Sequence, residues 1–516
     1  MSLYDDASLI MYPSGYKEDK IYSLKPTNGT GDLTFSRASS ATRVNAEGLI
    51  EEASVISTTE EVTNGNFATD SDWTKETGWS IVGGNLIATS VSGTAAYQVG
   101  SGLVSGKKYQ VQFEITEYTT GAIGLRAGTG ATLQTFSSIG VHYADMVAGG
   151  ALQIRFDVSG TTTLKVDNVS VKEVITSNIP RIDYTNGCGS LLLEKQSTNL
   201  ITYSESFDNA AFWALSNSAS ITSNNVTSPD GTLNADTLVA GASSSQVQGA
   251  IVGTSGAIYT VSMYIKRISG SGTVYLRAVE NANTPITVTT EWTRVYLTVT
   301  STATTIRAGV ALATSGDQVA IYGAQLEQSS YPTSYIPTSG TSTTRIKDTA
   351  SKTGLSSVIN STEGVLYAEI KGFENDAISR AISISDGTTS NRINLFFSSN
   401  QSQVIGRVSS AGVTVADMIY TGITQTTFNK IAVKYKVNDF ALWVNGVEVL
   451  SDLSGAVPTG LNQVSFDNAA TAYFYGNCQN LMVFPSALTD DELADLTGAV
   501  HQTFNSLATF YNYTIL

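Results

Sequence analysis

The chain has 516 residues, of which 14% are charged and 41% hydrophobic, and its formal net charge at pH 7 is −15. The length predicts three or four domains at roughly 100–200 residues each, and the hydrophobic content excludes a chain that is disordered throughout. The acidic balance excludes nucleic acid as an expected partner. Two cysteines exclude a disulfide scaffold and a multi-cysteine zinc site, and two histidines far apart in sequence make a histidine-rich metal site or a histidine-based triad hard to build.

The sequence also bears on membranes and export. It contains no run of about 20 apolar residues, so we expect no membrane insertion. Residues 1–20 lack a basic region followed by an apolar one, so we expect no signal peptide and a chain that folds in the cytoplasm where it is made.

Short strands dominate the predicted elements in chain order. Residues 109–115, 152–158, 260–265 and 295–299 alternate apolar and polar side chains with the period of a half-buried strand. Clusters of Gly, Asn and Ser separate such runs over hundreds of residues, which is typical of antiparallel sandwiches. Helical signals are rare: the clearest covers residues 488–496, where a threonine N-cap is followed three residues later by glutamate, and a second short helix is expected at 204–212.

Two parts of the chain repeat one pattern of residues. Phe is followed six residues later by Trp, eight residues after that by Ile and four residues after that by Asn. This spacing indicates a duplicated module, against the alternative that any two Ser/Thr-rich sandwiches look alike, and the two tryptophans are expected in the cores. The matching positions are Phe67, Trp73, Ile81 and Asn85 in the first copy, and Phe207, Trp213, Ile221 and Asn225 in the second.

The repeats carry a resemblance to a known family. Their openings at 64–67 and 204–207, the following tryptophans and the closing strands at 167–173 and 321–327 resemble jelly-roll carbohydrate-binding modules. Beyond the Thr/Ser/Gly stretch at 337–344, the chain resembles a concanavalin A-like, laminin G-type sandwich. The residues that carry this second resemblance are 364–369, 384–387, 391–395, 430–435, 442–447 and 483–493.

These resemblances imply an all-β fold of serial antiparallel sandwiches, two jelly rolls and a concanavalin A-like sandwich, after an extended N-terminal anchor. The implied domains are an anchoring segment at 1–60, a first module at 61–176, a linker at 177–200, a second module at 201–340 and the last sandwich at 341–516.

Two further segments resemble stretches that recur in bacteriophage structural proteins. The first is 33–51, and the second comprises 180–184, 189–194 and 198–204. The resemblance implies a virion appendage such as a tail fibre, head fibre or receptor-binding protein. It implies attachment to other virion proteins through the N-terminal segment, a homotrimer, and a host cell-surface glycan as partner.

Candidate site residues follow from the chemistry of sugar binding, in which aromatic rings stack on pyranose faces. We expect Trp79 and Tyr97 of the first module to be exposed for this purpose, and Tyr473 and Tyr475 to line a groove in the last domain; Trp443 is expected in a core. No cofactor is expected, although the laminin G resemblance leaves a calcium site open. Its conceivable ligands are Asp386, Asn391 and Asp467.

The sequence gives no convincing catalytic constellation, so we expect no enzyme. Glu114 and Glu117 flank a strand, and the three acids at 490–492 are explained by helix capping. Two alternatives to a glycan-binding appendage stay open. One is a purely structural capsid or tail decoration protein, and the other is a surface-glycan depolymerase.

Overall fold

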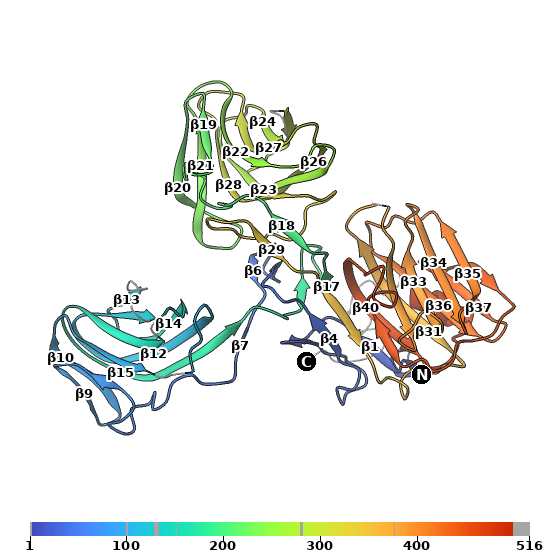
Figure 1. The fold of residues 1–516 in the computed structure, drawn as a ribbon, viewed down its shortest axis with the longest axis horizontal. Coiled ribbons are helices and arrows are strands. Elements are labelled where there is room, and N and C mark those ends of the chain that lie inside the picture. The colour runs from blue at the N-terminus through green and yellow to red at the C-terminus, as the bar shows by residue number, and fades with distance from the viewer. Residues whose placement is uncertain are drawn as a thin grey trace. The chain divides into compact units, whose positions relative to one another are not determined.

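The computed structural model describes residues 3–99, 102–127, 134–150, 152–278, 282–375 and 377–498 (Figure 1). The chain forms two compact units. One runs from Ser54 to Thr176, and the other combines the chain before it with the chain after it. Antiparallel sheets make up nearly all of the regular structure in the described residues, which confirms the all-β prediction. None of the described helices is long and apolar enough to span a bilayer.

The unit from Ser54 to Thr176 is the first predicted module. Its two longest strands, β12 and β15, pair with each other along most of their length, with register shifts that let them bend. Trp73, Phe113 and Phe156 are buried in its core. Its strands are β7 (Val55–Ile56), β8 (Thr74–Lys75), β9 (Trp79–Val82), β10 (Asn85–Val91), β11 (Ala95–Val99), β12 (Lys108–Ala127), β13 (Gln134–Phe136), β14 (Gly140–Val147) and β15 (Gln153–Ile175).

The second module is a sandwich of two five-stranded sheets within the larger unit. The strand orders are β19-β22-β27-β24-β25 and β20-β21-β28-β23-β26. Val261, Val310 and Ile321 are fully buried in its core. Its strands are β19 (Ala214–Ser216), β20 (Ala219–Thr227), β21 (Leu233–Ala240), β22 (Ser245–Val252), β23 (Ile258–Ser269), β24 (Val274–Ala278), β25 (Ala282–Ile286), β26 (Thr293–Thr300), β27 (Thr305–Leu312) and β28 (Gln318–Glu327).

The third sandwich packs an eight-stranded sheet against a nine-stranded one. The first sheet has the order β16-β17-β40-β31-β36-β37-β38, with β1 also paired to β40, and the second has the order β2-β3-β4-β30-β39-β32-β33-β34-β35. Its strands are β1 (Leu9–Met11), β2 (Tyr16–Lys17), β3 (Lys20–Ile21), β4 (Leu33–Ser36), β16 (Arg181–Asp183), β17 (Ser190–Leu193), β30 (Thr349–Lys352), β31 (Glu363–Gly372), β32 (Arg380–Ser385), β33 (Arg392–Phe397), β34 (Gln403–Ser410), β35 (Val413–Thr421), β36 (Asn429–Lys436), β37 (Phe440–Val444), β38 (Val447–Asp452), β39 (Gln463–Ser465) and β40 (Gly476–Phe484).

The structure of the N-terminal segment contradicts the expectation of an extended anchor. Residues 3–53 are not an extended anchor, because β1 pairs with β40 and β4 pairs with β30 inside the third sandwich. Leu9, Leu33 and Phe35 are at most 1% exposed in its core. Burial of these apolar side chains is the driving force that holds the segment in the sandwich. The remaining short elements are α1 (Leu3–Asp6), β5 (Thr42–Val44), β6 (Ile50–Glu52), β18 (Ser197–Asn199), β29 (Thr343–Arg345) and α2 (Asp490–Thr497).

The two modules share the contacts that a duplication predicts. The Tyr109 hydroxyl accepts a hydrogen bond from the backbone N–H five residues earlier at 2.8 Å, and Tyr259 does the same at 2.8 Å. The Phe67 and Trp73 rings lie 5.3 Å apart, and the matching pair in the second module lies 4.8 Å apart. Both repeated tryptophans are buried, as predicted.

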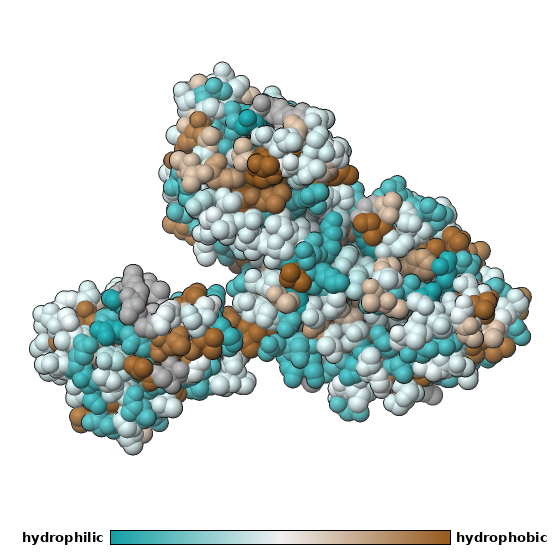
Figure 2. Space-filling model, in the orientation of Figure 1, coloured by the Kyte–Doolittle hydropathy of each residue, from teal (hydrophilic) through white to brown (hydrophobic). Residues whose placement is uncertain are grey.

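Local predictions had mixed outcomes. The helix near the C-terminus is confirmed as α2, with a complete capping box between Thr489 and Glu492, and Trp443 is 6% exposed, as a core residue should be. The short helix expected at 204–212 is wrong, because Ser204 exchanges hydrogen bonds with Thr338 and the segment forms turns. The visible surface of each unit mixes hydrophilic and hydrophobic side chains (Figure 2).

Candidate functional site

A network of buried ion pairs lies in the larger unit, where its segments meet. The Arg181 guanidinium donates to Glu194 Oε2 at 2.6 Å and to Asp348 Oδ2 at 2.5 Å. Arg37 contacts the other oxygen of Asp348 at 3.1 Å, and Arg345 contacts Glu194 at 2.8 Å. All five side chains are at most 2% exposed. We call these five residues the buried network.

Burial and the neighbouring charges shift the pKa values of the groups in the buried network. Burial alone would raise the pKa of Glu194, but Arg345 and Arg181 outweigh it and lower that pKa to about 2. Burial lowers the pKa of Arg37 to about 10 despite the attraction of Asp348. Backbone carbonyls accept further guanidinium hydrogens, as Ile179 does for Arg37 at 2.8 Å, whereas the buried Nε atoms of Arg181 and Arg345 have no hydrogen-bond partner among the described residues.

The buried network brings together the two segments that resemble bacteriophage structural proteins. Val44 N–H donates to Asp183 Oδ1 at 3.0 Å, and Tyr184 N–H donates to the Val44 carbonyl at 3.0 Å. The segments 33–51 and 180–184 are therefore in direct contact, although more than a hundred residues separate them. Sequence reasoning missed this. Ser36 and Ala38 flank Arg37, so no apolar run signals its burial.

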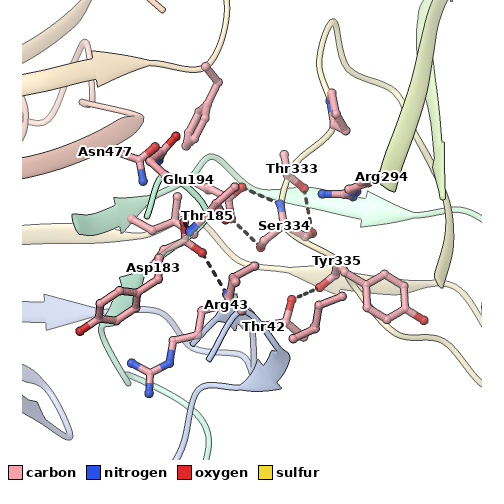
Figure 3. A pocket seen from close by; sticks show the side chains of 18 of the residues that line it. Thr42, Arg43, Asp183, Thr185, Glu194, Arg294, Thr333, Ser334, Tyr335 and Asn477 are labelled. Atoms are coloured by element: carbon pink, nitrogen blue, oxygen red, sulfur yellow. Dashed lines mark hydrogen bonds between the residues drawn. The ribbon is translucent and has the colours of Figure 1, made fainter. Parts of the chain in front are cut away.

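A cavity of about 450 Å³ lies beside the buried network, and we call it the junction cavity (Figure 3). It combines residues of the N-terminal segment, the linker, the second module and the third sandwich, all within the larger unit. Aromatic rings and charged or amide side chains share its wall. The residues of these kinds are Arg43, Asp183, Tyr184, Asn186, Glu194, Tyr264, Arg294, Tyr335, Lys371, Phe373 and Asn477.

Two cations of the junction cavity have no ion-pair partner among the residues that the structure describes. Arg294 donates from Nη2 to Ser262 Oγ at 3.0 Å, and its buried Nε has no hydrogen-bond partner. Lys371 donates to the Asn186 side-chain oxygen at 2.7 Å. Burial lowers the pKa of Lys371, and the nearby carboxylate of Asp183 partly offsets this. The cavity can therefore offer positive charge to a ligand.

A second cavity of about 250 Å³ gathers acids around a tyrosine. The Tyr322 hydroxyl lies 2.9 Å from Asp230 Oδ2 and 3.2 Å from Glu205 Oε1, and the Tyr335 hydroxyl lies 2.8 Å from the same Glu205 oxygen. Burial would raise the pKa of Asp230, but hydrogen bonds from Ser228 and its neighbours lower it. Burial and the two carboxylates raise the pKa of Tyr322. Glycoside hydrolysis needs a general acid with a raised pKa, and Asp230 does not provide one.

The first pair of predicted sugar-binding residues does not form an exposed aromatic surface. Trp79 is 6% exposed and belongs to the core of the first module, so the expectation that it is exposed is wrong. Ile81 lies two residues on in β9 and points to the same buried face, which is the period-2 signal for burial. Tyr97 is half-buried on β11, with the Arg155 guanidinium 5.2 Å from its ring centre.

The second predicted pair does come together. The Tyr473 and Tyr475 rings stack with centres 6.0 Å apart, and Lys347 Nζ lies 3.8 Å from the centre of the Tyr473 ring. Burial, with the nearby Tyr473 and Asp348, raises the pKa of Tyr475 to about 12. The lysine occupies one ring face, and neither tyrosine lines the junction cavity.

The three conceivable calcium ligands are not assembled at one point. Asp386 accepts a hydrogen bond from Asn391 at 2.9 Å, but Asp467 lies at the opposite end of the paired strands. The antiparallel register sets Ser383 opposite Ser465, which puts the two aspartates roughly 15 Å apart along the strands. Across the described residues, no group of three or more His, Cys, Asp or Glu side chains is placed to hold a metal.

No protein-family model matches this sequence, and no curated protein matches it. Similar solved structures include the Ruminococcus gnavus IT-sialidase CBM40 bound to alpha2,3 sialyllactose, with 21% identity, 28% of this chain and 86% of that chain covered, and a TM-score of 0.25. Another is the N-terminal CBM22-1-CBM22-2 tandem domain from Paenibacillus barcinonensis Xyn10C, with 8% identity, 54% and 98% covered, and a TM-score of 0.21. At such scores these likenesses carry no functional argument, and the resemblances to laminin G-type and bacteriophage proteins stay predictions from the sequence.

Proposed function

We propose that this chain is a structural subunit of a bacteriophage appendage, such as a tail fibre, head fibre or spike, and that its β-sandwiches bind glycans on the host surface. One observation carries the proposal. The segments 33–51, 180–184 and 189–194, which resemble recurring stretches of phage structural proteins, meet at the buried network and line the junction cavity. A fixed cavity with aromatic and polar side chains is the kind of site that binds a saccharide.

The proposal extends to assembly and location. The subunit would be part of the virion, contact other virion proteins through the N-terminal part of the chain, and form a homotrimer. Several copies facing one cell surface would multiply weak single-site affinities. Since residues 3–53 are folded into the third sandwich, we expect the virion contact to use the surface of that sandwich rather than a free tail.

We propose that the chain is not an enzyme. The second cavity brings Glu205 and Asp230 to one tyrosine hydroxyl, but hydrogen bonds hold the pKa of Asp230 low and burial holds that of Tyr322 high. A depolymerase would shorten capsule polysaccharide on incubation. We expect the chain length of the polysaccharide to stay unchanged, as measured by size-exclusion chromatography.

The binding role is tested with the full chain on an array of bacterial polysaccharides and on host cells. We expect retention on host cells and on a defined subset of glycans. Labelling the particle with an antibody against the chain should place it on an appendage. If the chain bound neither the array nor the cells but was still present on the particle, a purely structural decoration protein would be favoured. Absence of the chain from purified particles would contradict the virion role.

A further inference from the structure

We infer that the junction cavity binds an anionic saccharide unit, with Arg294 and Lys371 contacting its carboxylate or sulfate group. This inference rests on the proposed function and deepens it, because it names the binding site and the class of sugar. The charge of the cavity lining differs from that of the whole chain. The whole chain carries a net charge of −15, yet three cations, Arg43, Arg294 and Lys371, and two carboxylates, Asp183 and Glu194, line this cavity.

The carboxylates of the cavity already have partners. Arg181 and Arg345 bind Glu194 at 2.6 and 2.8 Å. Asp183 is 4% exposed and accepts backbone N–H groups on both oxygens, from Val44 at 3.0 Å and from Thr185 at 3.2 Å. The third cation of the cavity wall, Arg43, is paired with Glu51 at 2.7 Å. The charge of Asp183 acts on Lys371, but neither Lys371 nor Arg294 forms an ion pair in the part of the chain that the structure describes, so both cations can contact a ligand.

Arg294 is held in a position suited to an anion. Its guanidinium carbon lies 5.5 Å from the centre of the Tyr264 ring, and its Nη2 is fixed by Ser262. Its buried Nε has no hydrogen-bond partner among the described residues, so this N–H is free to donate to a ligand. A guanidinium that is fixed in this way can bind a carboxylate or sulfate through two parallel hydrogen bonds. Figure 3 shows Arg294 beside Thr333 and Ser334, residues that also line the cavity.

The rest of the wall suits a sugar ring. Tyr184, Tyr264 and Phe373 contribute aromatic surface, which stacks on the apolar face of a pyranose. Asn186 and Asn477 contribute amide groups of the kind that hydrogen-bond hydroxyls. A volume of about 450 Å³ lies within the range of small-ligand sites. An inorganic anion would use the cations but leave the aromatic wall without a partner.

The test measures binding of the full chain to four probes by titration calorimetry in 0.15 M NaCl. The probes are an oligogalacturonate and an oligosialic acid, which carry carboxylates, a chondroitin sulfate oligosaccharide, and a neutral dextran oligosaccharide. We expect at least one acidic probe to bind and the neutral one not to bind. Arg294→Gln should weaken the acidic probe about 10-fold or more, since a charged hydrogen bond is lost, and Lys371→Gln should also weaken it. Arg407→Gln is the matched control, because Arg407 lies outside the cavity in an exposed ion pair with Asp417.

The outcomes separate this inference from the proposed function. Loss of acidic-probe binding in the two cavity variants but not in the control, with unchanged melting temperatures, supports the inference. Binding of neutral glycans only, or acidic binding that survives both cavity substitutions, overturns it and leaves a glycan-binding appendage standing. Failure to bind any glycan or host cell overturns both. If inorganic sulfate displaced the bound acidic probe as effectively as free sugar did, the cavity would be an anion site without saccharide recognition. That result would also overturn the inference.

Discussion

At the scale of single residues, Asp348 holds the buried network together. It accepts hydrogen bonds from Arg37, Arg181 and the backbone N–H of Glu194. Replacing it with Asn would leave the guanidinium groups with one carboxylate fewer in a site that water does not reach. Breaking a buried ion pair leaves a buried charge without its partner, so we expect Asp348→Asn to destabilise the larger unit by about 3–5 kcal/mol.

This prediction is checked by thermal and urea unfolding followed by circular dichroism. Asp417→Asn is the matched control, because Asp417 pairs with Arg407 through two hydrogen bonds on the surface. Exposed pairs contribute less than about 1 kcal/mol, so the control should change the melting temperature little. Equal effects of the two substitutions would show that the buried network does not stabilise the fold.

Glu369 predicts a dependence of stability on pH. Burial raises its pKa from 4.5 to about 7, although Lys430 pulls the other way. The folded state therefore binds this proton more tightly than the unfolded state, and the contribution of Glu369 is most favourable below pH 4.5 and is lost as the pH rises to about 7. We expect Glu369→Gln to raise stability by about 1–3 kcal/mol at pH 8 and to change it little at pH 4.5.

The measurement is the melting temperature of both proteins from pH 4.5 to pH 8. Glu363→Gln, on the same strand, is the control, because Glu363 forms an exposed pair with Lys436 at 3.2 Å. The difference between wild type and Glu369→Gln should grow with pH, while the difference for the control should not. A flat difference for Glu369→Gln would mean that folding does not raise the pKa of Glu369.

At the scale of elements, β9 shows what alternation can predict. Trp79 and Ile81 share its buried face, so Trp79→Ala should leave a large cavity and destabilise the first module by about 3–5 kcal/mol. Tyr97→Ala, on half-buried β11, should cost much less. Proteolysis kinetics of the module check this. If Trp79→Ala reduced glycan binding with an unchanged melting temperature, the ring would be a binding residue after all.

The strands themselves were predictable from sequence, because alternation is a local property. Residues 109–115, 260–265 and 295–299 fall inside β12, β23 and β26, as the period-2 pattern predicts. The capping box of α2 is local as well, and the sequence predicted it in detail. Trp79 was mistaken for an exposed residue although its own strand carried the signal for burial.

The site was not predictable in the same way, because its partners are distant in sequence. Arg37 and Asp348 are separated by 311 positions. Nothing in the local sequence says which buried guanidinium meets which carboxylate. The segment at 177–200 was predicted as a linker between modules and 337–344 as a linker by composition, yet β17 pairs with β40, and Thr338 is buried against Ser204.

At the scale of the whole molecule, the larger unit is discontinuous, and this predicts how fragments behave. The module from Ser54 to Thr176 has its own core, and in the sequence it interrupts the other unit. We expect the fragment 54–176 to fold alone with a cooperative transition. We expect the fragment 177–516 not to do so, because it lacks Leu9, Leu33 and Phe35, which are at most 1% exposed in the core of the third sandwich, and it also lacks Arg37 of the buried network.

Circular dichroism melting and limited proteolysis of the two fragments measure this difference. A chain in which a Gly/Ser linker replaces residues 54–176 is the control. It keeps both halves of the larger unit, and Asp19 N–H donates to the Asn178 carbonyl at 2.9 Å, so the two halves already meet there. This shortened chain should melt cooperatively and resist protease as the full chain does. Cooperative melting of 177–516 would show that the third sandwich folds without residues 1–53. An anchoring role, in which these residues detach from the sandwich, would then explain their sequence better.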